Sequence, residues 1–301
     1  MKKNVFLKLA SALLVLCLAS TCAIGTTFAK YTTADKASDT ARVAKWGITV
    51  AVSGTLFGTD YESNTAADNV KDRITATSTS VSSLDGKIVA PGTKNDTGFQ
   101  VSITGKPEVQ YKVTADLNDK TISDIWLAKG TYAVMVLVYG VNADTDLTGL
   151  YVKNGTAYEP AGAYNSTEKY YAPHDVVEVT EEKYYPVAWY VKNTAGTTTP
   201  YTTLEAATTA MTTAFNAMGG NAKVQITETY TLTWAWPFEE GADADAKALR
   251  NAKDTILGNL AADANSVVKL SGANYVALTG AGTEYSLTIN FGFNVIVSQV
   301  D

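Results

Sequence analysis

The 301-residue sequence has few cysteines and histidines, and both shortages exclude classes of function. Its two cysteines, Cys17 and Cys22, lie in the N-terminal apolar segment, so the rest of the chain cannot form a disulfide bond. The single histidine, His174, cannot form a His-Glu-x-x-His zinc helix and leaves only one possible base for a Ser-His-Asp triad. We therefore expect no catalytic residues and no enzyme activity, and interpret His174 as a surface-loop residue beside Pro173.

Positive charge and long apolar runs are also scarce. Lys and Arg total 24 against 30 Asp and Glu, which gives a formal net charge of −6. Three of the lysines lie in the first 29 residues, so removal of that segment would leave 21 − 30 = −9. Such a chain has no electrostatic reason to bind nucleic acid or anionic lipid. Beyond the N-terminal segment no apolar run reaches about 18 residues, so we expect no integral membrane span after cleavage.

The N-terminal segment has the three parts of a secretory signal peptide. Three lysines precede an apolar run over residues 9–24, and Thr27, Phe28 and Ala29 form a small-x-small cleavage site. Cleavage between Ala29 and Lys30 by a signal peptidase would release the mature chain. We therefore predict a secreted protein.

Most of the remaining sequence is typical of β-sheet, because apolar and polar residues alternate with a period of two. The first run places Trp46, Ile48, Val50 and Val52 on one face of a strand. A hairpin is predicted from residues 99–103 and 109–113 around Gly105. Further strands are predicted at residues 132–141, 184–191, 224–238 and 285–297, with residues 142–179 as an insertion of short hairpins and loops. The first and last strands are expected to lie deep in the sheet.

Two segments have helical spacing instead. Residues 203–218 carry apolar side chains three or four positions apart and stop at two glycines. Residues 243–260 repeat this pattern, with Leu249, Ala252, Ile256, Leu257 and Leu260 on one face. We predict a mainly β fold: a single jelly-roll-like β-sandwich over residues 54–301, with two helical insertions. It follows a signal peptide (residues 1–29) and an N-terminal extension (residues 30–53).

The segment around the cleavage site resembles a known family. The signal ends in Thr27-Phe28-Ala29, an aromatic residue follows the cut, and a polar lead precedes Ala44-Lys45-Trp46-Gly47-Ile48-Thr49-Val50. This arrangement resembles the TasA/camelysin family of secreted fibre proteins of Gram-positive bacteria. Residues 90–113 and 285–301 share the likeness, whereas the middle of the chain does not.

The resemblance implies a donor strand. In that family the N-terminal segment completes the β-sandwich of the next subunit, so the partner would be another copy of this chain in a head-to-tail polymer. The donor-strand interface would consist of Val43, Trp46, Ile48, Val50 and Val52. The alternative is that this strand pairs within its own subunit, as most first strands do.

Two further hypotheses from the sequence concern binding of calcium and of sugar. Asn142, Asp144 and Asp146 resemble the start of a calcium loop, but Lys153 stands where a bidentate glutamate is wanted. The acidic run at residues 239–245 fits either calcium or a helix cap. Trp234 and Trp236, with the tyrosines and tryptophan of residues 184–190, could form a platform for sugar or could pack in the core.

We therefore expect a non-enzymatic structural subunit of extracellular fibres, in a biofilm matrix or at the cell surface, with calcium as a possible ligand and no other cofactor. The alternative is a monomeric surface adhesin or carbohydrate-binding module that uses the aromatic clusters. A camelysin-like metalloprotease is the least favoured, because no zinc motif supports it.

Overall fold

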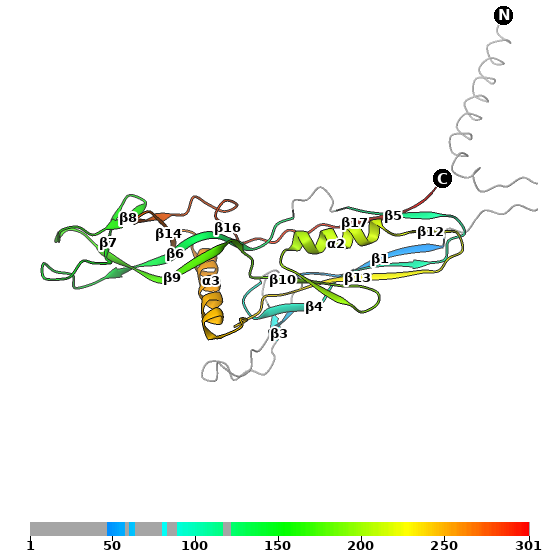
Figure 1. The fold of residues 1–301 in the computed structure, drawn as a ribbon, viewed down its shortest axis with the longest axis horizontal. Helices are drawn as coiled ribbons and strands as arrows, with labels where there is room; N and C mark the ends of the chain where they lie inside the picture. Colours follow the sequence, from blue (N-terminus) through cyan, green and yellow to red (C-terminus); the bar gives the residue numbers. More distant parts are fainter. Residues whose placement is uncertain (1–46, 58–59, 64–79, 83–88, 117–121, 301) are drawn as a thin grey trace, which may run out of the picture.

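The computed structural model describes residues 47–57, 60–63, 80–82, 89–116 and 122–300. This part of the chain is elongated and mainly β, as the sequence predicted, with most strands running along the long axis (Figure 1). The main cluster of buried apolar residues includes members from both halves of the molecule, such as Val101 and Tyr132. A second, smaller cluster lies at one end.

The half that contains the first strand is a sandwich of two antiparallel sheets. Its strands are β1 (Ile48–Gly54), β2 (Asp60–Ser63), β3 (Ser80–Ser82), β4 (Thr93–Gly105), β5 (Tyr111–Asp116), β10 (Ala188–Lys192), β11 (Thr198–Tyr201), β12 (Gly219–Gly220), β13 (Ile226–Ala235) and β17 (Asn294–Gln299). The larger sheet has the order β11-β10-β13-β4-β2-β3. β1 pairs with the stretch of β4 that β2 leaves free. The smaller sheet has the order β12-β5-β17.

The chain crosses between these sheets at the turn after β4. The predicted hairpin of residues 99–103 and 109–113 is wrong, because β4 pairs with β13 and β1 while β5 pairs with β17 and β12. Val101 and Ile103 of β4 and Val113 of β5 are fully buried in one cluster. Each strand has one apolar face, and stacking the two strands across the core buries both faces.

Helix α2 (Leu204–Asn216) covers this sandwich and packs against β5, β10 and β11. The predicted helix is confirmed, and its apolar face is buried at Leu204, Ala207, Met211 and Phe215. Thr203 caps the N-terminus by accepting a hydrogen bond from the backbone N–H of Ala206 at 3.1 Å.

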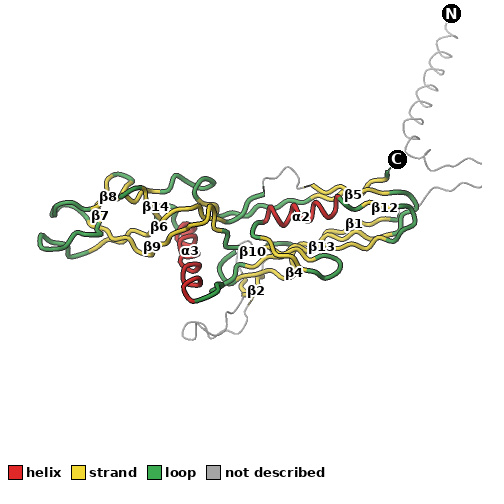
Figure 2. The backbone as a smooth tube through the Cα atoms, in the orientation of Figure 1, coloured by secondary structure: helices red, strands yellow, loops and turns green. Residues whose placement is uncertain are grey.

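In the other half of the molecule (Figure 2), six antiparallel strands pair into a closed ring, which the sequence did not reveal. These are β6 (Trp126–Val138), β7 (Tyr151–Asn154), β8 (Ala157–Pro160), β9 (Tyr170–Tyr184), β14 (Val267–Ser271) and β15 (Asn274–Ala277). The order is β6-β9-β7-β8-β15-β14, and β14 pairs back with β6. The hairpins expected in residues 142–179 therefore belong to the same ring as β14 and β15, which come about 90 residues later in the chain.

That second helix, α3 (Ala244–Ala262), lies across the long axis where the two halves meet (Figure 2). It packs against β6, β9 and β14, and Ile256, Leu257 and Leu260 are buried as predicted. Leu249 was predicted on the same face but is 43% exposed. Its position in the early turns explains this, because the N-terminal end of α3 projects beyond the strands (Figure 1).

The last alternating segment, residues 285–297, is not one strand. β16 (Tyr285–Ser286) pairs with β6 of the ring, whereas β17 pairs with β5 of the sandwich. The alternation is nevertheless real, because the predicted inward residues Leu287, Ile289, Phe291, Phe293, Val295 and Val297 pack against the main core. The strand is interrupted where the segment passes from one half to the other. The expected deep positions are also wrong, since β1 and β17 lie at sheet edges.

Two further predicted strands need correction. Residues 184–191 divide at Pro186, because Tyr184 ends β9 in the ring and Trp189 belongs to β10 in the sandwich. The strand at residues 132–141 was expected to be buried on both faces. This holds at Tyr132 and Ala133, but Val136 is 46% exposed where β6 extends towards the tip of the ring.

Candidate functional site: the first strand and its groove

β1 is held in the sheet by a single neighbour. All seven of its residues pair with β4, from Ile48 opposite Gly105 to Gly54 opposite Phe99. The other edge of β4 is occupied by β13 over the same stretch, so β1 fills the one remaining edge. Within the described part of the chain no strand pairs with the outer edge of β1. β1 therefore occupies a groove from which it could leave without disturbing another ladder.

The apolar face of β1 contacts the core over only part of its length. Ile48 and Val50 are partly buried and pack against the main cluster. Val52 lies opposite Val101, which is fully buried, yet Val52 itself is 60% exposed. Val52 thus keeps its predicted place on the apolar face, but the single chain does not cover it. β1 is an edge strand, and its side chains have neighbours on one flank only.

Close backbone contacts mark both ends of the β1–β4 ladder. A Cβ atom on Gly105 would lie 2.0 Å from the carbonyl oxygen of Gly47, and one on Gly54 would lie 2.1 Å from that of Gly98. Gly54 also has a φ of +74°, which glycine adopts readily. The ladder is therefore bounded by positions where the backbones touch and no side chain fits.

The chain is fixed to the core directly after β1. Leu56 is 3% exposed, and its carbonyl oxygen accepts hydrogen bonds from Trp234 Nε1 at 2.7 Å and Asn95 Nδ2 at 2.9 Å. Asn95 Nδ2 also donates to the carbonyl oxygen of Thr55. Leu56 is therefore an anchor, and Thr55 is the one residue between it and Gly54, the last residue of β1.

The electrostatics of this groove are simple. β1 contains no ionisable side chain. Burial and the charge of Glu228 raise the pKa of Tyr111 and of Tyr230, so both hydroxyls stay neutral near pH 7. Pairing of β1 with β4 therefore depends on backbone hydrogen bonds and apolar contacts.

Several predicted site residues lie outside the described residues. These are the cleavage-site residues Ala29 and Lys30 and the first two donor-strand residues, Val43 and Trp46. The structure thus places only Ile48, Val50 and Val52 of the predicted interface, and it places them against β4 of the same chain.

Two of the three candidate calcium residues, Asn142 and Asp146, act as turn caps. Asn142 Oδ1 accepts hydrogen bonds from the backbone N–H of Asp144 at 2.9 Å and from Thr145 Oγ1 at 3.3 Å, and Asp146 Oδ1 accepts from the backbone N–H of Thr148 at 2.9 Å. This last hydrogen bond lowers the pKa of Asp146. Among the described residues no group of three or more His, Cys, Asp or Glu side chains converges on a possible metal position.

The second acidic run, residues 239–245, also has structural roles. Asp243 caps α3 by accepting a hydrogen bond from the backbone N–H of Ala246 at 2.8 Å. Glu240 forms an ion pair with Arg250 at 3.0 Å. The helix-cap interpretation of this run is therefore confirmed.

The structure also places His174 and the tryptophans of the predicted aromatic clusters. His174 lies in β9 opposite Val134, not in a loop, and its Nδ1 is 2.9 Å from Asp175 Oδ1. Trp189, Trp234 and Trp236 are 0%, 1% and 5% exposed. The core-packing interpretation of these tryptophans is confirmed, and a sugar platform on Trp234 is wrong because its ring is covered.

Comparison with known proteins adds no family. No protein-family model matches the chain, and no curated protein or solved structure matches it. Within the residues that the structure describes, no helix is both long and apolar enough to span a membrane.

Sequence reasoning missed the anchor at Leu56. Its partners, Asn95 and Trp234, are 39 and 178 positions away in the chain, and no local pattern links them. Strand β4 bulges between Asn95 and Phe99, where four steps along β4 face two steps along β13. The sequence held a weak signal for this bulge, because Asn95 and Gly98 enclose a polar, turn-like stretch. Asn95 Oδ1 accepts a hydrogen bond from the backbone N–H of Gly98 at 2.8 Å.

Proposed function

We propose that the chain is a secreted structural subunit that polymerises into extracellular fibres by exchanging β1 between neighbouring copies. The observation that carries this proposal is the attachment of β1: it fills the free edge of one strand, β4, and is joined to a fixed anchor by a short link. In the fibre, the β1 of one copy would occupy the groove of the next. Strand addition of this kind uses backbone hydrogen bonds for affinity and side chains for register.

The energetics of exchange are close to balanced, which makes it feasible. Full burial of a valine or isoleucine contributes about 1.5–3 kcal/mol, and Ile48 and Val50 are only partly buried. A partner's β1 would recover the same contacts that a chain loses by releasing its own. Association of two copies costs about 4–15 kcal/mol. Assembly therefore depends on a high subunit concentration and on additional contacts in the fibre, such as burial of Val52.

The geometry favours filaments over closed dimers. The donor is β1 and the acceptor is the groove along β4, so the two contacting surfaces differ. A contact between different surfaces is heterologous and propagates unless rotation closes a ring. Leu56 would remain in the core of the donor copy, so successive subunits would be joined through Thr55, which connects Leu56 to the end of β1.

An engineered disulfide distinguishes exchange from self-pairing. Thr49 and Thr104 are exposed and lie directly opposite each other in the β1–β4 ladder. Opposed residues of antiparallel strands have Cα atoms about 4.5–5.5 Å apart, which suits a disulfide. We expect fibres of the variant with Thr49→Cys and Thr104→Cys, oxidised after assembly, to give a ladder of covalent oligomers on a non-reducing denaturing gel.

The matched control shares one of the two positions. Thr104 also lies opposite the exposed Thr227 of β13, and this pair stays within one chain in either arrangement. The variant with Thr104→Cys and Thr227→Cys should therefore run as a monomer on the same gel. If the Thr49→Cys, Thr104→Cys fibres also ran only as monomers, β1 would pair within its own subunit and the proposal would be wrong.

A further inference from the structure

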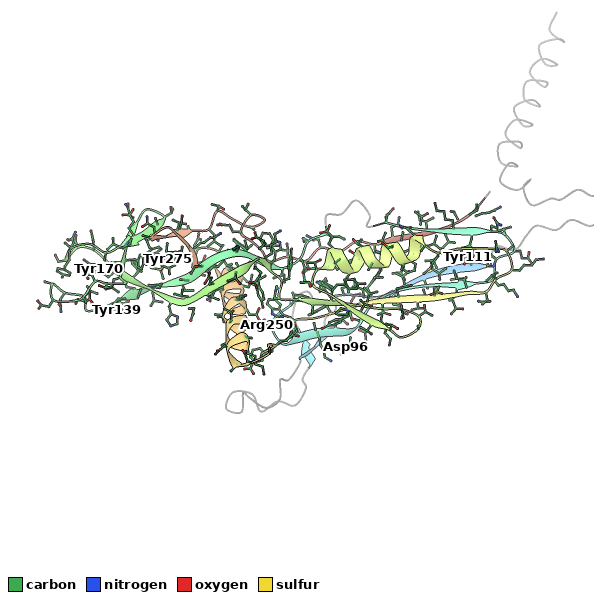
Figure 3. All side chains as sticks on the ribbon, in the orientation of Figure 1. Asp96, Tyr111, Tyr139, Tyr170, Arg250 and Tyr275 are labelled. Atoms are coloured by element: carbon green, nitrogen blue, oxygen red, sulfur yellow. The ribbon has the colours of Figure 1, made fainter. Side chains whose placement is uncertain are left out.

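The tip of the six-stranded ring carries exposed aromatic side chains. Tyr139 follows β6, and at 85% exposure it is the most exposed of the large apolar side chains in the described part of the chain. Tyr164, in the loop before β9, is 37% exposed. Tyr139 and Tyr170 lie at the end of the molecule remote from Tyr111 of the sandwich (Figure 3). This end is therefore open to solvent whether or not β1 is exchanged.

A cavity of about 270 Å³ lies between these tyrosines. It is lined by the end of β6 and the loop after it, residues 137–141, and by residues 164–166 and 168–170 before and at the start of β9. The ring of Tyr164 is nearly parallel to that of Tyr170, with centroids 6.2 Å apart and an interplanar angle of 10°. Two aromatic residues thus approach the cavity from one wall and Tyr139 from the other.

The wall of the cavity is fixed by its own hydrogen bonds. Tyr170 is 3% exposed, and its hydroxyl accepts a hydrogen bond from the backbone N–H of Asn165 at 2.7 Å. The side chain of Asn165 in turn accepts hydrogen bonds from the backbone N–H and the hydroxyl of Thr167. Tyr164 therefore rests on a rigid support, and a ligand that stacks on it would not have to order the loop first.

The polar groups of the cavity are mostly hydroxyls. The hydroxyls of Tyr139, Tyr164 and Ser166 make no hydrogen bond within the described part of the chain. Glu168 and Lys169 both line the cavity, so their charges balance. A ligand that fits these features is uncharged, has an apolar face and carries several hydroxyl groups.

We propose that this cavity binds one hexopyranose unit of a neutral polysaccharide. The C–H face of the sugar would stack on a tyrosine ring, and its hydroxyls would bond to the tyrosine and serine hydroxyls and to Glu168. The volume is just below the range of about 300–1,000 Å³ typical of drug-sized ligands, which suits a single sugar ring. The proposal is independent of fibre formation, because none of these residues belongs to β1 or its groove.

Affinity electrophoresis of the full mature chain tests it. Native gels would contain dextran, laminarin or galactomannan as neutral polysaccharides, or alginate as an anionic one. We expect at least one neutral polysaccharide to retard the protein, and alginate not to. Tyr139→Ala and Tyr164→Ala should each raise the apparent dissociation constant about tenfold, equivalent to 1.4 kcal/mol.

Two controls separate the cavity from general surface effects. Tyr139→Phe keeps the ring and should retain most of the retardation, and Leu249→Ala, at an exposed position of α3, should behave as the parent. The proposal is overturned if no neutral polysaccharide retards the parent, or if the two alanine variants bind as it does. Self-association that these variants abolish, without sugar binding, would instead assign the cavity to a second copy of the chain.

Discussion

At the scale of residues, two buried aspartates tie the helices to the strands. Asp124 Oδ2 accepts hydrogen bonds from Trp189 Nε1 at 3.0 Å and from the backbone N–H of Leu204, the first residue of α2, at 2.8 Å. Asp254 of α3 accepts a hydrogen bond from the Tyr184 hydroxyl at 2.8 Å. Burial raises the pKa of both carboxyls to about 6, although these donors favour the charged form.

These two carboxyls should make the folded chain more stable in mild acid. Their pKa is about 6 in the folded state against 3.8 for an exposed aspartate, so the folded state binds more protons between these values. The free energy of unfolding should therefore rise as the pH falls from 7 to 5. Since a pKa difference of one corresponds to about 1.4 kcal/mol, the gain per carboxyl is about 1.4 kcal/mol by pH 5 and at most about 3 kcal/mol below pH 3.8. Urea unfolding at several pH values measures it.

Asp254→Asn is the matched test of this pH dependence. Asparagine keeps an acceptor for the Tyr184 hydroxyl but cannot titrate, so the rise between pH 7 and 5 should be smaller. The pKa values of Glu181 and Glu284 are both lowered. Partial burial alone would raise them, but hydrogen bonds and a lysine beside each carboxylate have the larger combined effect. Their stabilisation is lost only below their ordinary pKa of 4.5. A free energy of unfolding that falls steadily from pH 7 to 5 would contradict the prediction.

At the scale of elements, β1 depends on glycine in its neighbour. The contact between Gly105 and the Gly47 carbonyl leaves no space for a Cβ. We expect Gly105→Ala to separate the start of β1 from β4 and to speed amide hydrogen exchange in both strands by at least tenfold. Hydrogen exchange followed by mass spectrometry measures this in the monomer.

A glycine of the ring provides the control. Gly155 has a φ of +61°, and nothing lies within 4 Å of a Cβ placed on it. Gly155→Ala should cost about 1–2 kcal/mol for the left-handed backbone and leave exchange in β1 unchanged. Unaltered protection of β1 in Gly105→Ala would show that the close contact does not hold the ladder.

At the scale of the whole molecule, the proposed donor and the sugar-binding tip lie in different halves (Figure 1). A chain that begins at Gly54 would lack nearly all of β1 and leave open the groove along β4, where Val101 and Ile103 are fully buried. We expect the truncated chain to form no filaments under the electron microscope, whereas the chain that begins at Lys30 does.

An unstable truncated chain would also fail to form filaments, so a second experiment supplies the missing strand as a separate peptide. A synthetic peptide of residues 30–53 should bind the truncated chain, raise its thermal midpoint and leave it monomeric, because a peptide can fill a groove but cannot continue a polymer. Filaments from the truncated chain alone would exclude β1 as the link between subunits.

What could be predicted from the sequence follows from local periodicity. The mainly β class, α2, α3 and β13 each depend on the spacing of neighbouring residues, which is visible along the chain. The inward faces were also predictable, as the alternation from Leu287 to Val297 shows. Each of these features depends on which face of a helix or strand is apolar and must be buried. The order of apolar and polar residues in the sequence determines that face by itself.

The pairing of strands was decided only by the tertiary structure. The apolar faces of β4 and β5 are compatible with a hairpin or with stacking across the core, and only the position of β13 and β17 selects the second. The closed ring, the anchor at Leu56 and the exposure of Val52 likewise depend on residues far apart in the chain. Periodicity specifies a face, but pairing depends on the other strands that compete for each edge.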